Sequence, residues 1–471
     1  MDNKERRKRI KGFLGAAGAV AAGAFLSWFF NMVYLPPEAG RFIIAAAVVF
    51  TLWRFFEYEP LLLGFVFLIP YNLYFFDLAG QYTVSFLHLI LLAVFLKFAE
   101  HRRFWKNPVS LLRDFPLPIL LYIILTGVSL LWSVDRGVSL RTALRWLVPA
   151  ASFLFGYRAA GRRLRARVVK TAVLSGLILI LFTAGQWVWG LRVERPRQVI
   201  REEFAKESSP LFIFIDSDRL RDERVNWLAP GGDIRAFGTF ANANNLAGFL
   251  GLIFFLIYTL KVFREKNKLY LDFLPPLIFG LVLMMTGSKT GLLAFALSLP
   301  VFLAFKGKGR WKRLAVYAAL IAVIAVIFHT RVIPVRGFDR TESGFRWRVN
   351  QSRDAVEYII ENPFGTGLGT YPDILPHNIF ITAGLFLGFA GVGVFLWMFF
   401  YIFAGGIRKF RGSSDPYGKR LALCLLCGFL WFIIHAQADN FNISDNVGML
   451  FWLQAGMLLS REKSPELKEA R

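Results

Sequence analysis

Three short segments, far apart along this chain, each place a cationic or imidazole side chain where an apolar run begins. Their key residues are Arg235, Lys289 and His377. Guanidinium and ammonium groups bind phosphate oxygens, and an imidazole accepts and releases protons near neutral pH. If the three segments meet in space, they could bind an anionic substrate and move a proton during a reaction.

The first segment is GGDIRAFGTFANANNLAG, residues 231–248. Asn242 and Asn244 stand where a helix is expected to begin, and asparagine there commonly caps free backbone N–H groups. Capping explains one asparagine, and we take Asn244 as a candidate substrate-binding residue. Arg235 either binds an anion or extends its charged end to the lipid headgroups.

The second segment is MTGSKTGLLAF, residues 285–295, where two apolar runs meet with almost no loop. Ser288 and Thr290 can cap the following helix, and Lys289 stands at its N-terminus. The helix dipole already makes that end positive, so a lysine there indicates an anion supplied from elsewhere. The anion is either a substrate, with Ser288 as a further contact, or a lipid phosphate.

The third segment, residues 332–376, contains GFRWRVNQSRDAVEYII, whose apolar residues recur at helical spacing. This pattern predicts an amphipathic helix on the membrane surface, with Arg346 and Arg348 as candidate substrate contacts. Downstream, Gly365, Gly367 and Gly369 imitate a phosphate-binding loop, but without a preceding strand the motif is weak and a flexible turn explains it.

His377 and Asn378 follow at the start of the next apolar run. The histidine is either a structural interface residue or a proton acceptor, and Asn378 is a candidate substrate contact. In the run HAQADNFNISDN, His435 and Asp439 are four residues apart and share a helix face, but a solvated turn capped by Asp445 is the favoured interpretation. Cys424 and Cys427 are interpreted as small buried hydrophobes rather than as a redox or metal motif.

The composition decides which elements must position these residues. Of the 471 residues, 56% are hydrophobic and 19% are charged, with 50 phenylalanines and 13 tryptophans. These values exclude a disordered chain and an ordinary soluble enzyme, and they indicate an all-α polytopic membrane protein.

A transmembrane helix needs ~20 apolar residues. Fourteen candidate spans meet this pattern, three of them short, so we expect 12–14 transmembrane helices and two larger external loops. They lie at about 12–34, 40–57, 59–78, 82–99, 116–134, 139–158, 168–191, 243–262, 270–288, 289–306, 313–331, 377–404, 420–438 and 446–460.

Orientation follows from the distribution of lysine and arginine. When the basic N-terminus is placed in the cytoplasm, every strongly basic short connection and the C-terminal tail fall on the cytoplasmic side. The net charge of +24 is therefore interpreted mainly as a result of the membrane topology, and the basic residues are also expected to contact membrane lipids. No nucleic acid partner is expected. The expected regions are 1–191 (N-terminal helices), 192–242 (external loop), 243–331 (central helices), 332–376 (external loop with the amphipathic helix) and 377–471 (C-terminal helices and cytoplasmic tail).

The chain resembles the O-antigen ligase and polymerase family of bacterial envelope glycosyltransferases. The resemblance rests on Arg235 with GTFANANNLA, on TGSKTGLL, and on NPFGTGLGTY with PHNIFITAGLFLGFAGVGVF, in this order, and it covers about 230–460. It implies a C-type glycosyltransferase fold in the bacterial inner membrane, with a catalytic cavity facing the periplasm. It also implies a donor glycan on undecaprenyl diphosphate, a lipid-linked glycan acceptor, and neither a metal nor another cofactor.

The resemblance assigns the family's functional arginine to Arg235 and its functional histidine to His377. The second family arginine falls on Lys289, where this chain departs from the family, and lysine lacks the bidentate fork of arginine. Under this hypothesis Arg235 and Lys289 stabilise the leaving diphosphate, and His377 deprotonates the acceptor hydroxyl in an inverting attack.

The function that we expect is transfer of a glycan from undecaprenyl diphosphate to a lipid A-core acceptor. A polymerase that extends the glycan, including a teichuronic-acid-type polymerase, uses the same chemistry, and the sequence does not separate these activities. An exporter of polysaccharide or lipid without catalysis is the alternative of another class. Such a transporter would be expected to carry a series of intramembrane charges, and the sequence contains no such series.

Overall fold

In the computed structural model of this chain, the described residues are 37–71, 74–78, 82–101, 115–159, 161–192, 236, 238–240, 242–260, 269–305, 310–329, 342–370, 374, 376–439 and 445–460. The predicted first span, 12–34, and most of the predicted external loop 192–242 lie outside them.

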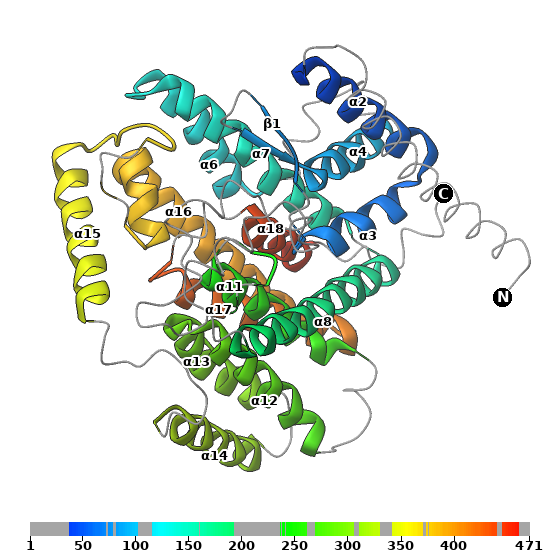
Figure 1. Ribbon diagram of the computed structural model, residues 1–471, viewed down its shortest axis with the longest axis vertical. Coiled ribbons are helices and arrows are strands. Elements are labelled where there is room, and N and C mark those ends of the chain that lie inside the picture. Colours follow the sequence, from blue (N-terminus) through cyan, green and yellow to red (C-terminus); the bar gives the residue numbers. More distant parts are fainter. Residues whose placement is uncertain are drawn as a thin grey trace, which may run out of the picture.

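The described chain is built almost entirely of helices, which confirms the predicted all-α membrane architecture (Figure 1). The helices are α2 (Pro37–Phe55), α3 (Tyr58–Leu68), α4 (Phe86–His101), α6 (Leu117–Val128), α7 (Arg136–Arg158), α8 (Arg162–Arg192), α11 (Ala243–Phe254), α12 (Leu269–Thr286), α13 (Lys289–Phe305), α14 (Arg310–His329), α15 (Glu342–Glu361), α16 (Ile379–Gly412), α17 (Pro416–His435) and α18 (Asp445–Leu459). Two short 3₁₀ turns, η2 (Ser129–Leu131) and η4 (Phe255–Thr259), follow α6 and α11.

One small sheet interrupts the helical pattern. Strands β1 (Tyr74–Leu78) and β2 (Tyr82–Ser85) pair antiparallel, with Asp77 opposite Thr83. The predicted spans 59–78 and 82–99 placed these residues in helices. Aromatic and β-branched residues such as those of YFFDL and YTVS favour strands, and apolar content alone does not distinguish a strand from a helix.

Several described helices have the length and composition of membrane spans. Among the described residues, three helical segments are long and apolar enough to cross a bilayer, namely Arg162–Gly185 in α8, α16 and α17, and seven shorter apolar helices accompany them. Large apolar side chains such as Leu181 and Phe400 are more than 70% exposed, as is normal for surfaces that face lipid. The chain is therefore a membrane protein, and the total of 12–14 spans stays a prediction.

Helices α11, α17 and α18 form the centre of the molecule (Figure 1). Nearly all of α11 is buried, and Trp431 of α17 packs where Gly251 of α11 leaves no room for a Cβ. Helix α18 crosses α7 just as closely, because a Cβ on Gly156 or Gly456 would collide with the backbone of the other helix. Small residues allow such close backbone approach between membrane helices. This packing fixes the ends of α17 and α18.

The glycine-rich loop after α15 holds a break in α16. Gly388, inside α16, has a φ of +65°, and a Cβ there would collide with the carbonyl of Pro363. The N–H groups of Thr366 and Gly367 donate to the carbonyls of Leu385 and Phe386, at 2.8 and 3.0 Å, next to the break. These N–H groups therefore satisfy helix carbonyls, so neither the phosphate-binding interpretation nor the flexible turn describes this loop.

Candidate active site

The last turn of α17 leads into a buried polar centre. His435, the final residue of α17, is fully buried, and Asp439 is 5% exposed. Hydrogen bonds from the N–H of Ala438 to the carbonyl of His435, and from Gln437 to Ile434, fold the chain back at this point. The interpretation of His435 and Asp439 as part of a solvated turn is therefore wrong. Neighbouring helices cover this turn, and the sequence pattern alone did not indicate that cover.

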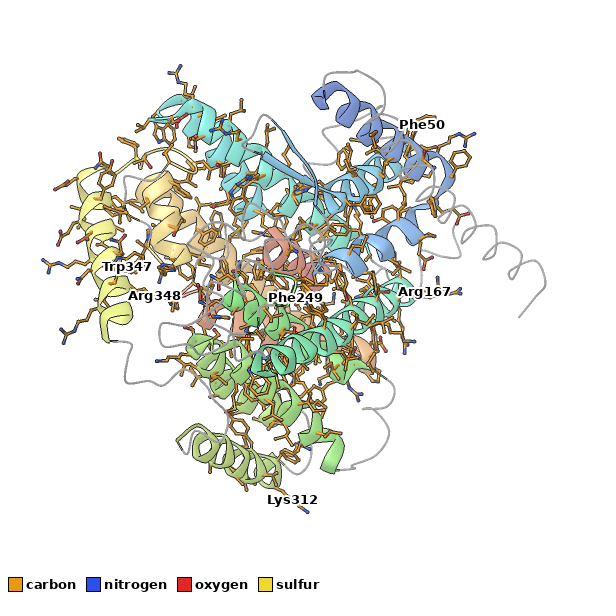
Figure 2. The ribbon with its side chains drawn as sticks, in the orientation of Figure 1. Phe50, Arg167, Phe249, Lys312, Trp347 and Arg348 are labelled. Carbon is orange, nitrogen blue, oxygen red and sulfur yellow. The ribbon has the colours of Figure 1, made fainter. Side chains whose placement is uncertain are left out.

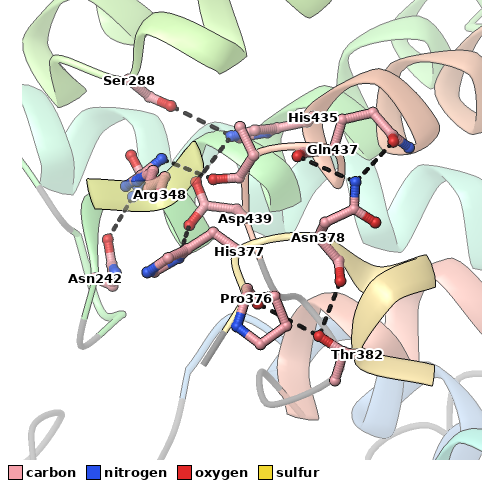
Figure 3. Close-up of polar contacts among 12 residues, drawn as sticks. Asn242, Ser288, Arg348, Pro376, His377, Asn378, Thr382, His435, Gln437 and Asp439 are labelled. Carbon is pink, nitrogen blue, oxygen red and sulfur yellow. Dashed lines mark hydrogen bonds and ion pairs between the residues drawn. The ribbon is translucent and has the colours of Figure 1, made fainter. Parts of the chain in front are cut away.

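His377 reaches the same place from the start of α16. The Ile379 N–H donates to the carbonyl of Ala436 at 3.2 Å, which ties the beginning of α16 to the end of α17. His377 Nδ1 then lies 4.0 Å from Asp439 Oδ1 (Figure 3). Asn378 caps α16, since its Oδ1 accepts from Phe380 N–H at 2.9 Å.

The start of α13 forms another wall of the centre. Ser288 is 2% exposed, and its Oγ shares a 3.3 Å hydrogen bond with His435 Nε2. The same hydroxyl accepts from Gly291 N–H at 3.2 Å, as a helix cap does. Lys289 is the first residue of α13, so its position at the helix N-terminus agrees with the prediction.

Helix α15 brings an arginine and a tryptophan to the centre from the edge of the molecule (Figure 2). Arg348 Nη1 donates to the carbonyl of Ala438 at 2.7 Å, within the turn that carries Asp439. The Trp347 ring packs edge-on against His377, with 5.4 Å between ring centroids. Ala355 and Ile359 of α15 are buried, and Ile359 fills the space over Gly384 of α16.

The segment before α11 lies next to the end of α12. The N–H of Ala236 donates to the carbonyl of Met285 at 2.9 Å. Asn242 caps α11, because its Oδ1 accepts from Asn244 N–H at 2.8 Å, and Asn244 itself is buried. Arg235 lies outside the described residues, so its side chain is not placed, although it directly precedes Ala236.

Several positively charged groups border the centre. The N-termini of α13 and α16 both open toward it, and each carries partial positive charge from its helix dipole. Arg348 adds a full charge, and its bond to Ala438 uses one of the five N–H donors of a guanidinium. Burial lowers the pKa of His377 to about 4, and the charge of Arg348 acts in the same direction. The imidazole is therefore neutral at neutral pH and able to accept a proton.

A family model described as O-antigen ligase matches residues 276–398. This segment is similar to the O-antigen ligase family. Members of the family are glycosyltransferase-like enzymes. The resemblance found in the sequence is thereby confirmed over this segment. No curated protein matches the chain.

The O-antigen ligase segment supplies most, but not all, of the centre. It includes Ser288, Arg348 and His377, which the structure places around the same segment, residues 435–439. Lys289 adjoins Ser288, whereas Arg346 is exposed on α15. Asn378 and Asn244 take part in helix caps, and their predicted contact with substrate stays a prediction.

His435 and Asp439 lie beyond the matched segment and were missed as site residues. Their four-residue spacing in an otherwise apolar helix end was the only signal for them in the sequence. The contact with His377, 62 positions away from Asp439, depends on the tertiary fold. Together the groups can bind an anion and accept a proton. Within the described part of the chain, no three His, Cys, Asp or Glu side chains are grouped to hold a metal ion.

Proposed function

We propose that this protein is an inverting, metal-independent glycosyltransferase that moves a glycan from undecaprenyl diphosphate to a lipid A-core acceptor. The observation that carries the proposal is that His377, Arg348 and Ser288 each contact a different residue of the segment 435–439 at the end of α17. The O-antigen ligase segment supports the same class of reaction. The helical bundle is proposed to be of the C-type glycosyltransferase kind.

The site is proposed to open on the periplasmic face of the inner membrane, with both termini in the cytoplasm. The predicted cytoplasmic helix ends support this side, because they gather away from the site. Arg162 at the start of α8 lies 3.4 Å from Asp415, which caps the start of α17. Lys409, near the end of α16, donates to the carbonyl of Ser460 at 2.9 Å. The polar contacts at the start of α17 are therefore separate from the candidate site at its end.

The donor's diphosphate is proposed to bind between α13 and α15. Breaking the bond between the anomeric carbon and the diphosphate oxygen leaves the electron pair on that oxygen. Cations and helix N-termini stabilise this charge without needing to reorganise. Lys289, Arg348 and the α13 N-terminus supply them, with Arg235 as the expected third cation and Arg346 as an outer contact. The polyprenyl chain would lie against the apolar helices.

His377 is proposed to be the general base. The acceptor hydroxyl oxygen attacks the anomeric carbon, its proton passes to His377, and undecaprenyl diphosphate leaves from the opposite face. A single displacement of this kind inverts the anomeric configuration. A positioned general base contributes typically ~10²–10⁴-fold to the rate.

The decisive experiment combines the purified protein, a lipid-diphosphate-linked glycan and a panel of acceptors, with product mass as the readout. Transfer to a lipid A-core acceptor supports the ligase. Extension of the donor glycan instead identifies the polymerase alternative, and the absence of any product with every acceptor contradicts both.

Variants of three proposed site residues accompany this experiment. Arg235→Ala is expected to abolish transfer while the protein remains in the membrane, and wild-type transfer by this variant would remove Arg235 from the site. Lys289→Arg is expected to retain or raise transfer, because arginine restores the bidentate contact with phosphate. The substitution His377→Ala separates catalysis from export. A polysaccharide exporter would tolerate this change, whereas the transferase would lose turnover.

A further inference from the structure

Behind His377 lies a chain of buried polar groups that spans three parts of the sequence. Ser288 Oγ and Asp439 Oδ2 lie 3.3 and 3.7 Å from the same atom, His435 Nε2. Asp439 Oδ1 lies 4.0 Å from His377 Nδ1 (Figure 3). The order is therefore Ser288, His435, Asp439 and His377, leading from the start of α13 to the start of α16.

We propose that Asp439 and His435 are positioning residues that orient the proposed base, His377, and couple it to the α13 N-terminus that binds the donor. This inference rests on the proposed function, because it assigns roles in that reaction. Neither residue is proposed to touch the substrate. Asp439 acts through His377, and His435 acts through Asp439.

The burial of the carboxylate is the first argument. Asp439 is 5% exposed and His435 is fully buried, and a buried carboxylate is costly unless neighbouring groups stabilise it. A sequence that needed only a stable turn could place an apolar residue here at no such cost. An acid placed between two imidazoles at this cost therefore indicates a functional role.

The orientation of His377 is the second argument. Its Nδ1 faces Asp439, which favours the tautomer with the proton on Nδ1 and leaves Nε2 to accept a proton. The 4.0 Å separation exceeds a hydrogen bond, and catalytic hydrogen bonds of a resting site commonly tighten only when substrate is bound. Once His377 has taken the acceptor's proton, the carboxylate stabilises the imidazolium. Asp439 should thus act on kcat more than on KM.

The balance of charge around His377 is the third argument. Among the described residues, Arg348 comes from α15, Asp439 and His435 come from α17 and its turn, and Lys289 begins α13. Burial and then the charge of Arg348 disfavour a proton on His377, whereas an ionised Asp439 at 4.0 Å would favour one. A bound diphosphate would offset the charge of Arg348 and act in the same direction as Asp439. Donor binding would in this way strengthen the base when it is needed.

His435 links Asp439 to the start of α13, where the donor is proposed to bind. Its Nε2 is shared between Asp439 and Ser288, and Ser288 caps the helix that begins with Lys289. A shift of the α13 start on donor binding would therefore be passed to Asp439. Glutamine can place a nitrogen where His435 has Nε2, whereas leucine removes the polar link.

The test measures the pKa of His377 without using the reaction. Detergent-purified full-length protein is treated with diethyl pyrocarbonate, which modifies neutral imidazoles, over a range of pH, and the His377 peptide is followed by mass spectrometry. Asp439→Asn should lower the pKa of His377 by about one unit or more, because an attractive anion is lost. Asp354→Asn, which removes an exposed acid of α15, is the matched control and should leave that pKa unchanged.

The same variants are assayed for glycan transfer. Asp439→Asn should lower kcat about tenfold or more with little change in KM, a smaller loss than removal of the base itself. His435→Leu should shift both readouts in the same direction, and His435→Gln should restore most of the activity. Because the two His435 variants keep Asp439 in place, they test the coupling even where Asp439→Asn does not fold.

The outcomes separate this inference from the proposed function. An unchanged His377 pKa in Asp439→Asn and in His435→Leu, with normal transfer, overturns the positioning roles and leaves the transferase standing. A shifted pKa in a protein that transfers no glycan to any acceptor upholds the coupling and overturns the transferase. Equal loss of activity in His435→Gln and His435→Leu would also contradict the coupling.

Discussion

The site has two sides that differ in burial. On one side, Ser288, His435 and Asp439 are almost completely enclosed by α11, α13 and α17. On the other, α15 brings Arg348 and Trp347 from the edge of the molecule, and Trp347 remains 49% exposed (Figure 2). His377 lies between the two sides, with a side chain that is 24% exposed. The difference teaches that the proposed positioning groups are fixed within the bundle, whereas the arginine proposed to bind the anion comes from a helix that borders the surroundings.

The largest expected effect comes from the residue that joins the two sides. His377→Ala should lower the turnover by ~10²–10⁴-fold, the usual contribution of a general base, while binding of the lipid diphosphate donor persists. The measurement is the rate of product formation beside donor binding by the purified variant. His101→Ala, at the end of α4, serves as the control histidine. Near-normal turnover of His377→Ala would leave the proposed reaction without its base.

The next effect tests the exposed side. Arg348→Ala should lower kcat/KM for the donor by ~10–100-fold, because a hydrogen bond to a charged group is worth ~1.5–3 kcal/mol. Arg353→Ala is the matched control, since Arg353 on the same helix is 77% exposed and pairs with Glu357 at 2.8 Å. Similar losses in the two variants would show that α15 contributes general positive charge and no specific contact.

The pH dependence of kcat/KM and kcat reports how the exposed side of the site, with Arg348, acts on His377. With neutral His377 as the proposed proton acceptor, kcat/KM should be constant at higher pH and fall as the pH drops through about 4, the pKa of His377. Diphosphate bound at Arg348 should raise that pKa, so kcat should fall at a higher pH than kcat/KM does. Asp439 and His435 are the other titratable groups of α17 and its turn near His377. Coincident acid limbs would argue against coupling between the two sides.

The smallest effect concerns the outer surface of α15. Val349, Val356 and Ile360 are all more than 40% exposed and lie along one strip of the helix, at 100° per residue. The predicted position of this helix on the membrane surface places that strip in contact with lipid. A nitroxide at position 356, with both buried cysteines replaced by alanine, should be more accessible to oxygen than to a polar nickel reagent. A label at position 354 should show the reverse, and equal nickel access at both positions would contradict the prediction.

Much of the fold was predictable because apolar helices are encoded locally. Runs of ~20 apolar residues predict α16 and α17, and the spacing of apolar residues in 345–360 predicts α15. The strands at 74–85 were not predictable in this way, because their residues are as apolar as those of a helix. The break at Gly388 also depends on a distant partner, the carbonyl of Pro363, which no local pattern reveals.

The site was predictable where a residue type carries its own chemical signal. His377 and Lys289 stand beside helix starts, and resemblance to a family added weight to both. Asp439 gave no comparable signal, because an acid near a chain turn is ordinarily solvated. Its burial results from the packing of α17 against α11, α13 and α16, which only the assembled structure contains.

The most direct test of the account is to locate the bound donor by photo-crosslinking. A lipid diphosphate with a photoreactive group next to its phosphates is irradiated with the full-length protein in liposomes, and the crosslinked peptides are mapped by mass spectrometry. We expect crosslinks at residues 286–291, 346–348 and 376–378 that disappear with excess undecaprenyl diphosphate. Competable crosslinks confined to the opposite helix ends, around Arg162, Lys409 and Asp415, would contradict the account.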